Sequence, residues 1–126
     1  MNNVLSNKTT AQNFLLEVAS GKVDEAFEKY ISPKFIHHNA YFKGDLESLK
    51  TAMKENATLN PQKQITILRV LGEENMVATH SHIKQNPTDL GAVVVHIFRF
   101  ENEKIIELWD VGTGVPKEII NDYGIF

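Results

Sequence analysis

The hydrophobic residues near the start of the chain recur with helical spacing. They lie at i, i+3, i+4 and i+7, which is typical of one buried helical face, at Ala11, Phe14, Leu15 and Val18. Thr9 and Gln12 have the spacing of a capping box, and Gly21 has the residue type that commonly follows a helix end. The pattern therefore predicts a first helix that begins at Thr9 or Thr10 and ends near Gly21.

Two further helices are predicted before residue 61. The same spacing recurs at Val23, Ala26, Phe27 and Tyr30, and Pro33 prevents that helix from continuing. Asp45 can cap a third helix that buries Leu46, Leu49 and Met53 and stops at Asn60 and Pro61. Residues 35–40, between these two helices, are predicted to be extended.

Beyond residue 61 the hydrophobic period changes to that of strands. We predict strands at residues 64–71, 76–85, 92–100 and 104–111, and a tail from Pro116 to Phe126 that is apolar enough to dock on the fold. Helices followed by consecutive strands favour a single α+β domain over residues 1–126, with an antiparallel sheet. Such a sheet twists strongly, so it would wrap around the helices and leave a cone-shaped cavity.

The main candidate chemistry lies in the predicted hairpin at residues 93–111. His96 interrupts an apolar strand, which is costly unless its ring is hydrogen-bonded or used, and Asp110 directly follows Trp109. A two-residue turn would pair His96 with Trp109 and separate His96 from Asp110. A three-residue turn at residues 101–103 would pair His96 with Leu108 and place His96 and Asp110 on one face. We favour the three-residue turn, although a left-handed Glu103 would cost on the order of 1 kcal/mol.

The preceding strand adds two histidines. His80 and His82 are two residues apart, so both side chains face the same side of a strand. If residues 85 and 91 pair across the next loop, His80 lies opposite His96. His80 and His82 then share one wall with His96 and Asp110. A shift of this pairing by one residue would turn His80 and His82 away. Such a cluster could also ligate zinc, whereas the alternative is pocket lining for His80 and surface for His82.

Composition narrows the function classes. The chain is 42% hydrophobic with a net charge of -3 and no basic stripe, so nothing indicates a nucleic acid or an anionic membrane as partner. The absence of cysteine excludes disulfides and thiolate catalysis. The N-terminus lacks the pattern of a secretory signal, and no apolar stretch has the length of a membrane span, so we expect a cytoplasmic protein.

Several segments resemble one protein family. They are FIHHN at 35–39, VATHS at 77–81, VHIFRF at 95–100, KIIELWDV at 104–111 and YGIF at 123–126. Together they resemble the SnoaL-like polyketide cyclase family of the NTF2-like superfamily, over nearly the whole chain. The chain departs from many relatives at His96, where they carry an acid, at Glu103, where several have glycine, and at Ala40, where several have proline.

The resemblance implies a fold and a chemistry. The fold would be a curved sheet and three helices that form a cone, often a homodimer through the outer sheet face, where Trp109 would pack. The chemistry would be acid–base catalysis without a cofactor on carbonyl compounds, such as aldol ring closure. Asp110 would be the general base, because an apolar cone raises the pKa of a carboxyl group. His96 or His80 would stabilise the enolate by hydrogen bonding.

The resemblance and the patterning also suggest side chains that contact a small-molecule ligand. The family match favours His38 over His37 as the inward residue, and the full set is His38, Asn39, His82, Phe98 and Tyr30. The alternatives are a solvated acid for Asp110 and a core histidine for His96. We therefore keep three hypotheses: an acid–base enzyme with no cofactor, a non-catalytic module that binds a hydrophobic ligand, and a histidine-based metal site.

Overall fold

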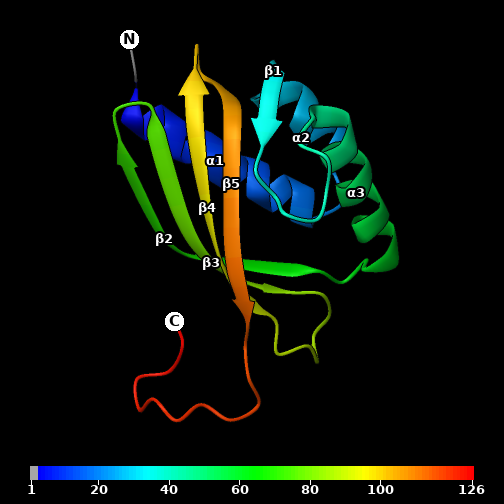
Figure 1. Cartoon of the computed structure of the whole chain (residues 1–126), viewed down its shortest axis with the longest axis vertical. Coiled ribbons are helices and arrows are strands. Elements are labelled where there is room, and N and C mark those ends of the chain that lie inside the picture. Colours follow the sequence, from blue (N-terminus) through cyan, green and yellow to red (C-terminus); the bar gives the residue numbers. More distant parts are fainter. Residues whose placement is uncertain (1–2) are drawn as a thin grey trace.

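The computed structural model describes residues 3–126, which form three helices and five strands. In chain order these are α1 (Val4–Ala19), α2 (Val23–Tyr30), β1 (Ile31–His37), α3 (Leu46–Leu59), β2 (Gln64–Glu73), β3 (Met76–Lys84), β4 (Ala92–Glu101) and β5 (Lys104–Gly114). They build one curved sheet in the order β1-β5-β4-β3-β2 (Figure 1). The predicted α+β cone is confirmed, with the addition that edge strand β1 runs parallel to β5.

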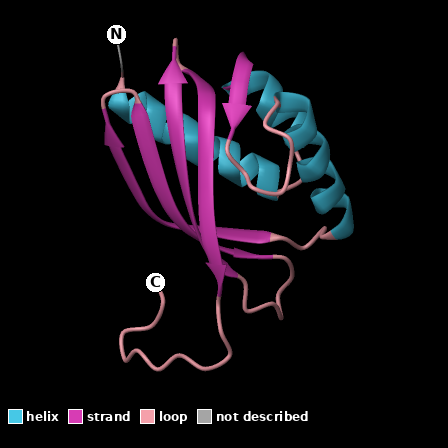
Figure 2. Ribbon diagram, in the orientation of Figure 1, coloured by secondary structure: helices cyan, strands magenta, loops and turns pink. Residues whose placement is uncertain are grey.

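All three helices cover the same face of the sheet (Figure 2). Helix α1 packs across β2 and β3, whereas α2 and α3 lie beside β1. Aromatic rings join α1 to α2 and to the sheet, because the Phe14 ring meets Phe27 of α2 at 5.5 Å and Phe98 of β4 at 6.4 Å, both edge to face. Phe14 and Phe98 are fully buried, so the contact of α1 with β4 lies at the centre of the core.

Helix α1 begins earlier than the predicted start, at Val4. The side chain of Asn3 accepts a hydrogen bond from the Ser6 amide at 3.0 Å and caps the helix. The prediction was wrong because the first turn breaks the hydrophobic period: Leu5 is exposed and Asn7 is buried. The predicted cap of α3 is confirmed, since the side chain of Asp45 accepts a hydrogen bond from the backbone amide of Ser48, the third residue of the helix.

The hairpin of β4 and β5 turns through two residues, not three. Asn102 and Glu103 have φ angles of 51° and 67°, and Glu101 pairs with Lys104 across them. The ladder then shifts, because Phe100 pairs with Ile105 but Arg99 pairs with Glu107. The extra residue in β5 is a β-bulge, which was absent from the predicted register.

This bulge decides which side chains of the hairpin share a face. His96 pairs directly with Asp110, two residues away from the predicted partner Leu108. A shift of two residues leaves every side chain on its predicted face, whereas a two-residue turn without a bulge would have separated the two groups. The predicted common face of His96 and Asp110 is therefore present, although the predicted turn is wrong.

Glycine at position 103 is expected to stabilise the protein. A turn with two left-handed residues favours asparagine followed by glycine, and Glu103 holds a φ of 67° against its side chain. We expect Glu103→Gly to raise the free energy of unfolding by about 1 kcal/mol in urea denaturation. Glu103→Ala is the matched control, because it removes the same charge and keeps a Cβ atom. Equal stability of the two variants would contradict strain at this position.

The register of β3 and β4 differs from the prediction by one residue. Thr79 pairs with His96, and His80 pairs with Val95. An odd shift reverses the faces, so His80 and His82 lie on the outer face of the sheet. The predicted wall of three histidines and Asp110 is therefore wrong.

The loop between β3 and β4 explains this register. One carboxylate, that of Asp89, accepts hydrogen bonds from the backbone amides of Gln85 at 2.9 Å and Gly91 at 3.0 Å. These two bonds close the loop, and the ladder begins with Ile83 opposite Ala92. The sequence-based pairing of residues 85 and 91 did not include this closure.

The C-terminal tail docks in part. Its last residue, Phe126, places its ring 4.5 Å from the ring of His82 on the outer face. Ile120 and Tyr123 are 98% and 94% exposed, so the middle of the tail does not pack on the fold. No helix in the described residues 3–126 is long and apolar enough to span a membrane.

Candidate functional site

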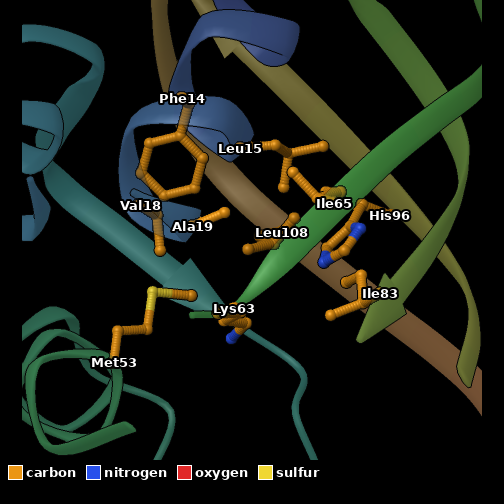
Figure 3. A pocket seen from close by; sticks show the side chains of 10 residues that line it. All are labelled: Phe14, Leu15, Val18, Ala19, Met53, Lys63, Ile65, Ile83, His96 and Leu108. Atoms are coloured by element: carbon orange, nitrogen blue, oxygen red, sulfur yellow. The ribbon is translucent and has the colours of Figure 1, made fainter. Parts of the chain in front are cut away.

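A cavity of about 70 Å³ lies between α1 and the inner face of the sheet (Figure 3). Helix α3 and the start of β2 complete its wall. Most lining side chains are apolar and two are titratable; the set is Phe14, Leu15, Val18, Ala19, Met53, Lys63, Ile65, Ile83, His96 and Leu108. Chemistry in this cavity therefore depends first on His96 and Lys63.

His96 reaches the cavity from the middle of β4. It is 7% exposed, and no described residue hydrogen-bonds to its Nδ1 atom. Burial lowers the pKa of His96 to about 4, the carboxylate of Asp110 acts against this, and the ammonium of Lys63 adds to it. The ring is consequently neutral near pH 7, with one nitrogen able to donate a hydrogen bond and the other able to accept one.

Asp110 lies directly across the ladder from His96, on β5. Side chains in such a pair have Cβ atoms roughly 4.5–5.5 Å apart. Asp110 is half-buried, and its Oδ2 atom accepts a hydrogen bond from Nδ2 of Asn39 at 2.9 Å. Asn39, expected to contact a ligand, instead holds the carboxylate that was expected to be the base.

Lys63 is a cavity residue that the sequence interpretation missed. Its Nζ atom donates to Oδ1 of Asn56 at 2.7 Å, and Nδ2 of Asn56 donates to Oε1 of Gln85 at 3.3 Å. Burial lowers the pKa of Lys63. A signal was present in the sequence, because residue 63 directly precedes a predicted strand and shares the face of the apolar residue Ile65.

Two further polar side chains lie on the inner face beside His96. Thr79 is its cross-strand neighbour on β3, and Ser81 follows two residues later on the same face. Both are buried, and neither hydroxyl oxygen has a hydrogen-bond partner among the described residues. A buried polar group without a partner costs about 1–3 kcal/mol, so this part of the inner wall is polar at the expense of stability.

The other predicted histidines lie outside this cavity. Nδ1 of His80 accepts a hydrogen bond from Arg69 at 2.7 Å, and Nε2 of His82 donates to the carbonyl of Leu90 at 2.8 Å. The zinc hypothesis required both rings on the same face as His96, which the register excludes. Within residues 3–126, no group of three or more histidine, aspartate or glutamate side chains is placed to hold a metal ion.

The two histidines at the end of β1 are reversed relative to the prediction. His37 is the buried residue, and its Nε2 atom donates to the carbonyl of Lys43 at 2.6 Å. His38 lies on the outer side, where its ring stacks on Trp109 at 5.0 Å and its Nε2 atom donates to Glu107 at 2.6 Å. The expected contact of His38 with a ligand in the cone is therefore wrong.

Glu107 also bonds Arg99 on the outer face. The guanidinium of Arg99 donates from Nε at 2.8 Å and from Nη2 at 2.7 Å to the same carboxylate oxygen. The hydrogen bond from His38 and the guanidinium of Arg99 lower the pKa of Glu107. The outer face thus carries its own polar network, separate from the cavity.

Phe98 and Tyr30 were also expected to contact a ligand. Phe98 is fully buried, and its ring contacts Phe14 and stacks on His96 at 6.0 Å, so it packs in the core beside His96 and does not line the cavity. Tyr30 lies beneath the ammonium of Lys29, 5.2 Å from the ring centroid, and does not line the cavity. Neither expectation matches the position of the side chain.

Comparisons with known proteins agree with this architecture. The sequence model of the SnoaL-like domain family matches residues 11–108 of this chain. No curated protein sequence matches the chain. Similar solved structures include AclR from Streptomyces galilaeus, a hydroxylase candidate, with 16% identity, a TM-score of 0.75 and coverage of 88% of this chain and 91% of that one.

Two further structures show how varied these relatives are. A candidate polyketide cyclase from Acidithiobacillus ferrooxidans has 18% identity, a TM-score of 0.70 and coverage of 85% and 87% of the two chains. An LEH-like epoxide hydrolase from M. tuberculosis has 13% identity, a TM-score of 0.69 and coverage of 87% and 84%. At these identities the likeness establishes the fold, and activity has to be argued from the site.

Proposed function

Because this chain belongs to the SnoaL-like domain family, we propose that it is an acid–base catalyst that needs no cofactor and acts on a small carbonyl compound. One observation carries the proposal: His96 lines an apolar cavity, and Asp110 is its direct cross-strand neighbour. A carboxylate beside a neutral imidazole provides a proton acceptor next to a hydrogen-bond donor.

The two groups have distinct proposed roles. Asp110 accepts the proton from the carbon next to the carbonyl, and Asn39 bonds Oδ2 and leaves Oδ1 for that proton. His96 is neutral, because its pKa is about 4, and donates a hydrogen bond to the oxygen of the developing enolate. The reaction types that fit are aldol-type cyclisation and isomerisation, since both begin with an enolate.

Cavity size limits the compound. The cavity of about 70 Å³ is smaller than a cavity of roughly 150 Å³ that binds benzene. Only a short acyl chain, or one end of a larger molecule, fits inside as the side chains stand. The carbonyl end is the part that must enter, because His96 lies on the wall.

Replacing the carboxylate of Asp110 tests this function. Proton exchange next to the carbonyl of acetone, 2-butanone and cyclopentanone in D₂O, followed by proton NMR, measures enolate formation without a known substrate. We expect the protein to accelerate exchange of at least one ketone, and Asp110→Asn to reduce the acceleration about 100-fold. Asp122→Asn, an exposed change of the same kind in the tail, should leave the rate unchanged. A folded Asp110→Asn protein with full acceleration would remove the proposal.

A non-catalytic binding module is the second candidate. It is favoured by the largely aliphatic wall and by the position of Asp110 beside His96 and outside the cavity lining. Native mass spectrometry of the purified protein separates the two candidates. An unaltered small molecule that co-purifies, together with no exchange activity, would support binding alone.

The homodimer also remains a proposal. It would use the outer sheet face, where Leu71 and Val111 are exposed and Trp109 is half-buried. An exposed apolar sheet face of this kind commonly marks an interface. The same native mass spectra report the oligomeric state, and a monomer at micromolar concentration would contradict the dimer. The cytoplasmic location likewise stays a prediction.

A further inference from the structure

Lys63 is one of two titratable residues that line a cavity formed otherwise by apolar side chains (Figure 3). The residue follows α3 and directly precedes β2, and its long side chain lines the same cavity as His96. Its Nζ atom bonds a neutral partner, Oδ1 of Asn56, at 2.7 Å. A charged group removed from water is costly unless an opposite charge or several hydrogen bonds compensate it.

The described part of the chain supplies no such opposite charge. Within residues 3–126, no aspartate or glutamate forms an ion pair with Lys63. The other lysines that pair with acids, Lys29, Lys50 and Lys54, do so near the surface. Lys63 therefore keeps donor capacity for a group from outside the chain, since an ammonium has three N–H donors and Asn56 accepts one.

His96 supplies a second, independent indication of a ligand. It is more than nine-tenths buried, it lines the same cavity, and its Nδ1 atom has no partner among the described residues. A ligand that filled the cavity could offer a polar atom to His96 and an anionic oxygen to Lys63. The two requirements together describe a small molecule with an acidic group and a second polar group.

The sheet keeps the cation away from the proposed base. Lys63 lies at the start of β2 and Asp110 on β5, and both β3 and β4 lie between these strands. Adjacent strands are roughly 4.8 Å apart, so a negative group at Lys63 is well separated from the carboxylate of Asp110. A ligand could therefore place a carboxylate at one end of the cavity and a carbonyl near His96.

We propose that Lys63 is the anion-binding residue of this cavity and that the compound it takes is a short-chain keto acid, whose carboxylate bonds Nζ. This assignment rests on the proposed function for the role of the carbonyl, but the binding of the carboxylate does not. Burial lowers the pKa of the Lys63 ammonium, and a bound carboxylate would raise it again, so ligand and proton stabilise each other.

A pair of simple probes tests the carboxylate preference. Butyrate and butyramide have nearly the same shape and differ in charge, and titration of each is followed by ¹H–¹⁵N NMR of the whole protein. We expect butyrate to bind at least about tenfold more tightly than butyramide, because charge-assisted hydrogen bonds are the stronger ones. Equal affinities, or no binding of either probe, would overturn the proposal.

Variants then assign the preference to Lys63. Lys63→Met should weaken butyrate about tenfold and leave butyramide within twofold, while Lys34→Met, an exposed change of the same kind, should alter neither. Asn56→Asp keeps Lys63 and places a carboxylate on its ammonium, so it should also remove the preference for butyrate. This second variant keeps the test decisive if Lys63→Met fails to fold.

The outcomes separate this proposal from the catalytic one. If both Lys63→Met and Asn56→Asp still bind butyrate more tightly than butyramide, the proposal is overturned. Lys63 would then only stabilise the end of α3 through its hydrogen bond to Asn56. Asp110→Asn should keep the preference even if it abolishes exchange. If exchange is absent from the wild-type protein but the preference depends on Lys63, the catalytic proposal falls and the anion site stands.

Discussion

Acidification from pH 6.5 to pH 4 is expected to destabilise the wild-type protein by about 3 kcal/mol more than it destabilises a His96→Gln variant. The pKa of His96 is about 4 in the folded protein, because burial disfavours the imidazolium, and 6.5 when the ring is exposed. Between these two values the unfolded chain binds the proton and the folded protein does not. The neutral, buried His96 therefore makes its full contribution to the free energy of unfolding above pH 6.5, and this contribution is lost as the pH falls through 4.

Urea denaturation of both proteins at several pH values measures this difference. Other acids and histidines also titrate in this range, so the informative quantity is the difference between wild type and His96→Gln. His80→Gln is the matched control, because His80 lies on the outer face of the sheet and hydrogen-bonds to Arg69 instead of an acid. Parallel pH profiles for wild type and His96→Gln would contradict a neutral, buried His96.

Phe98→Ala is expected to destabilise the protein by about 3–5 kcal/mol. The side chain is fully buried, meets Phe14 at 6.4 Å and Phe100 at 6.5 Å, and stacks on the ring of His96. Its removal would leave a void in the core beside His96 that the surrounding side chains cannot readily fill.

Urea denaturation at pH 7 checks this expectation against Phe42→Ala. Phe42 is 45% exposed and outside the core, so its truncation should cost less than about 1 kcal/mol. Similar losses for the two variants would contradict a central role for Phe98. Phe98→Ala should also expose part of the His96 ring to water, because the ring that stacks on it is removed. The pKa of His96 measured by NMR should therefore rise.

Local periodicity was enough to locate most of the elements. The bounds of α2, the cap of α3 at Asp45 and the positions of strands β2 to β5 follow from spacing and from residues that favour caps and turns. The inward side of β4 also follows, since His96, Phe98 and Phe100 alternate with residues of the outer face. These features depend on each residue and its immediate neighbours, which the sequence contains directly.

Two differences between the predicted and the observed sheet share one origin, which is strand register. The bulge at the start of β5 and the closure of the loop by Asp89 each changed a register, and one of them turned His80 and His82 away from the cavity. In a strand, successive side chains point to opposite faces, so an error of one residue exchanges inside for outside. Register depends on loop conformation and on contacts between residues distant in the chain, and periodicity carries no information on either.

The pairing of His96 with Asp110 was determined partly by the sequence and partly by the tertiary structure. The alternation of polar and apolar positions placed an acid and a histidine on neighbouring strands, and the family resemblance pointed to the same pair. Only the tertiary structure decided that they are direct neighbours, that Asn39 holds the carboxylate, and that Lys63 enters the same cavity from the start of β2. Alternation is a property of a single strand, whereas the membership of a cavity is set by how several elements pack together.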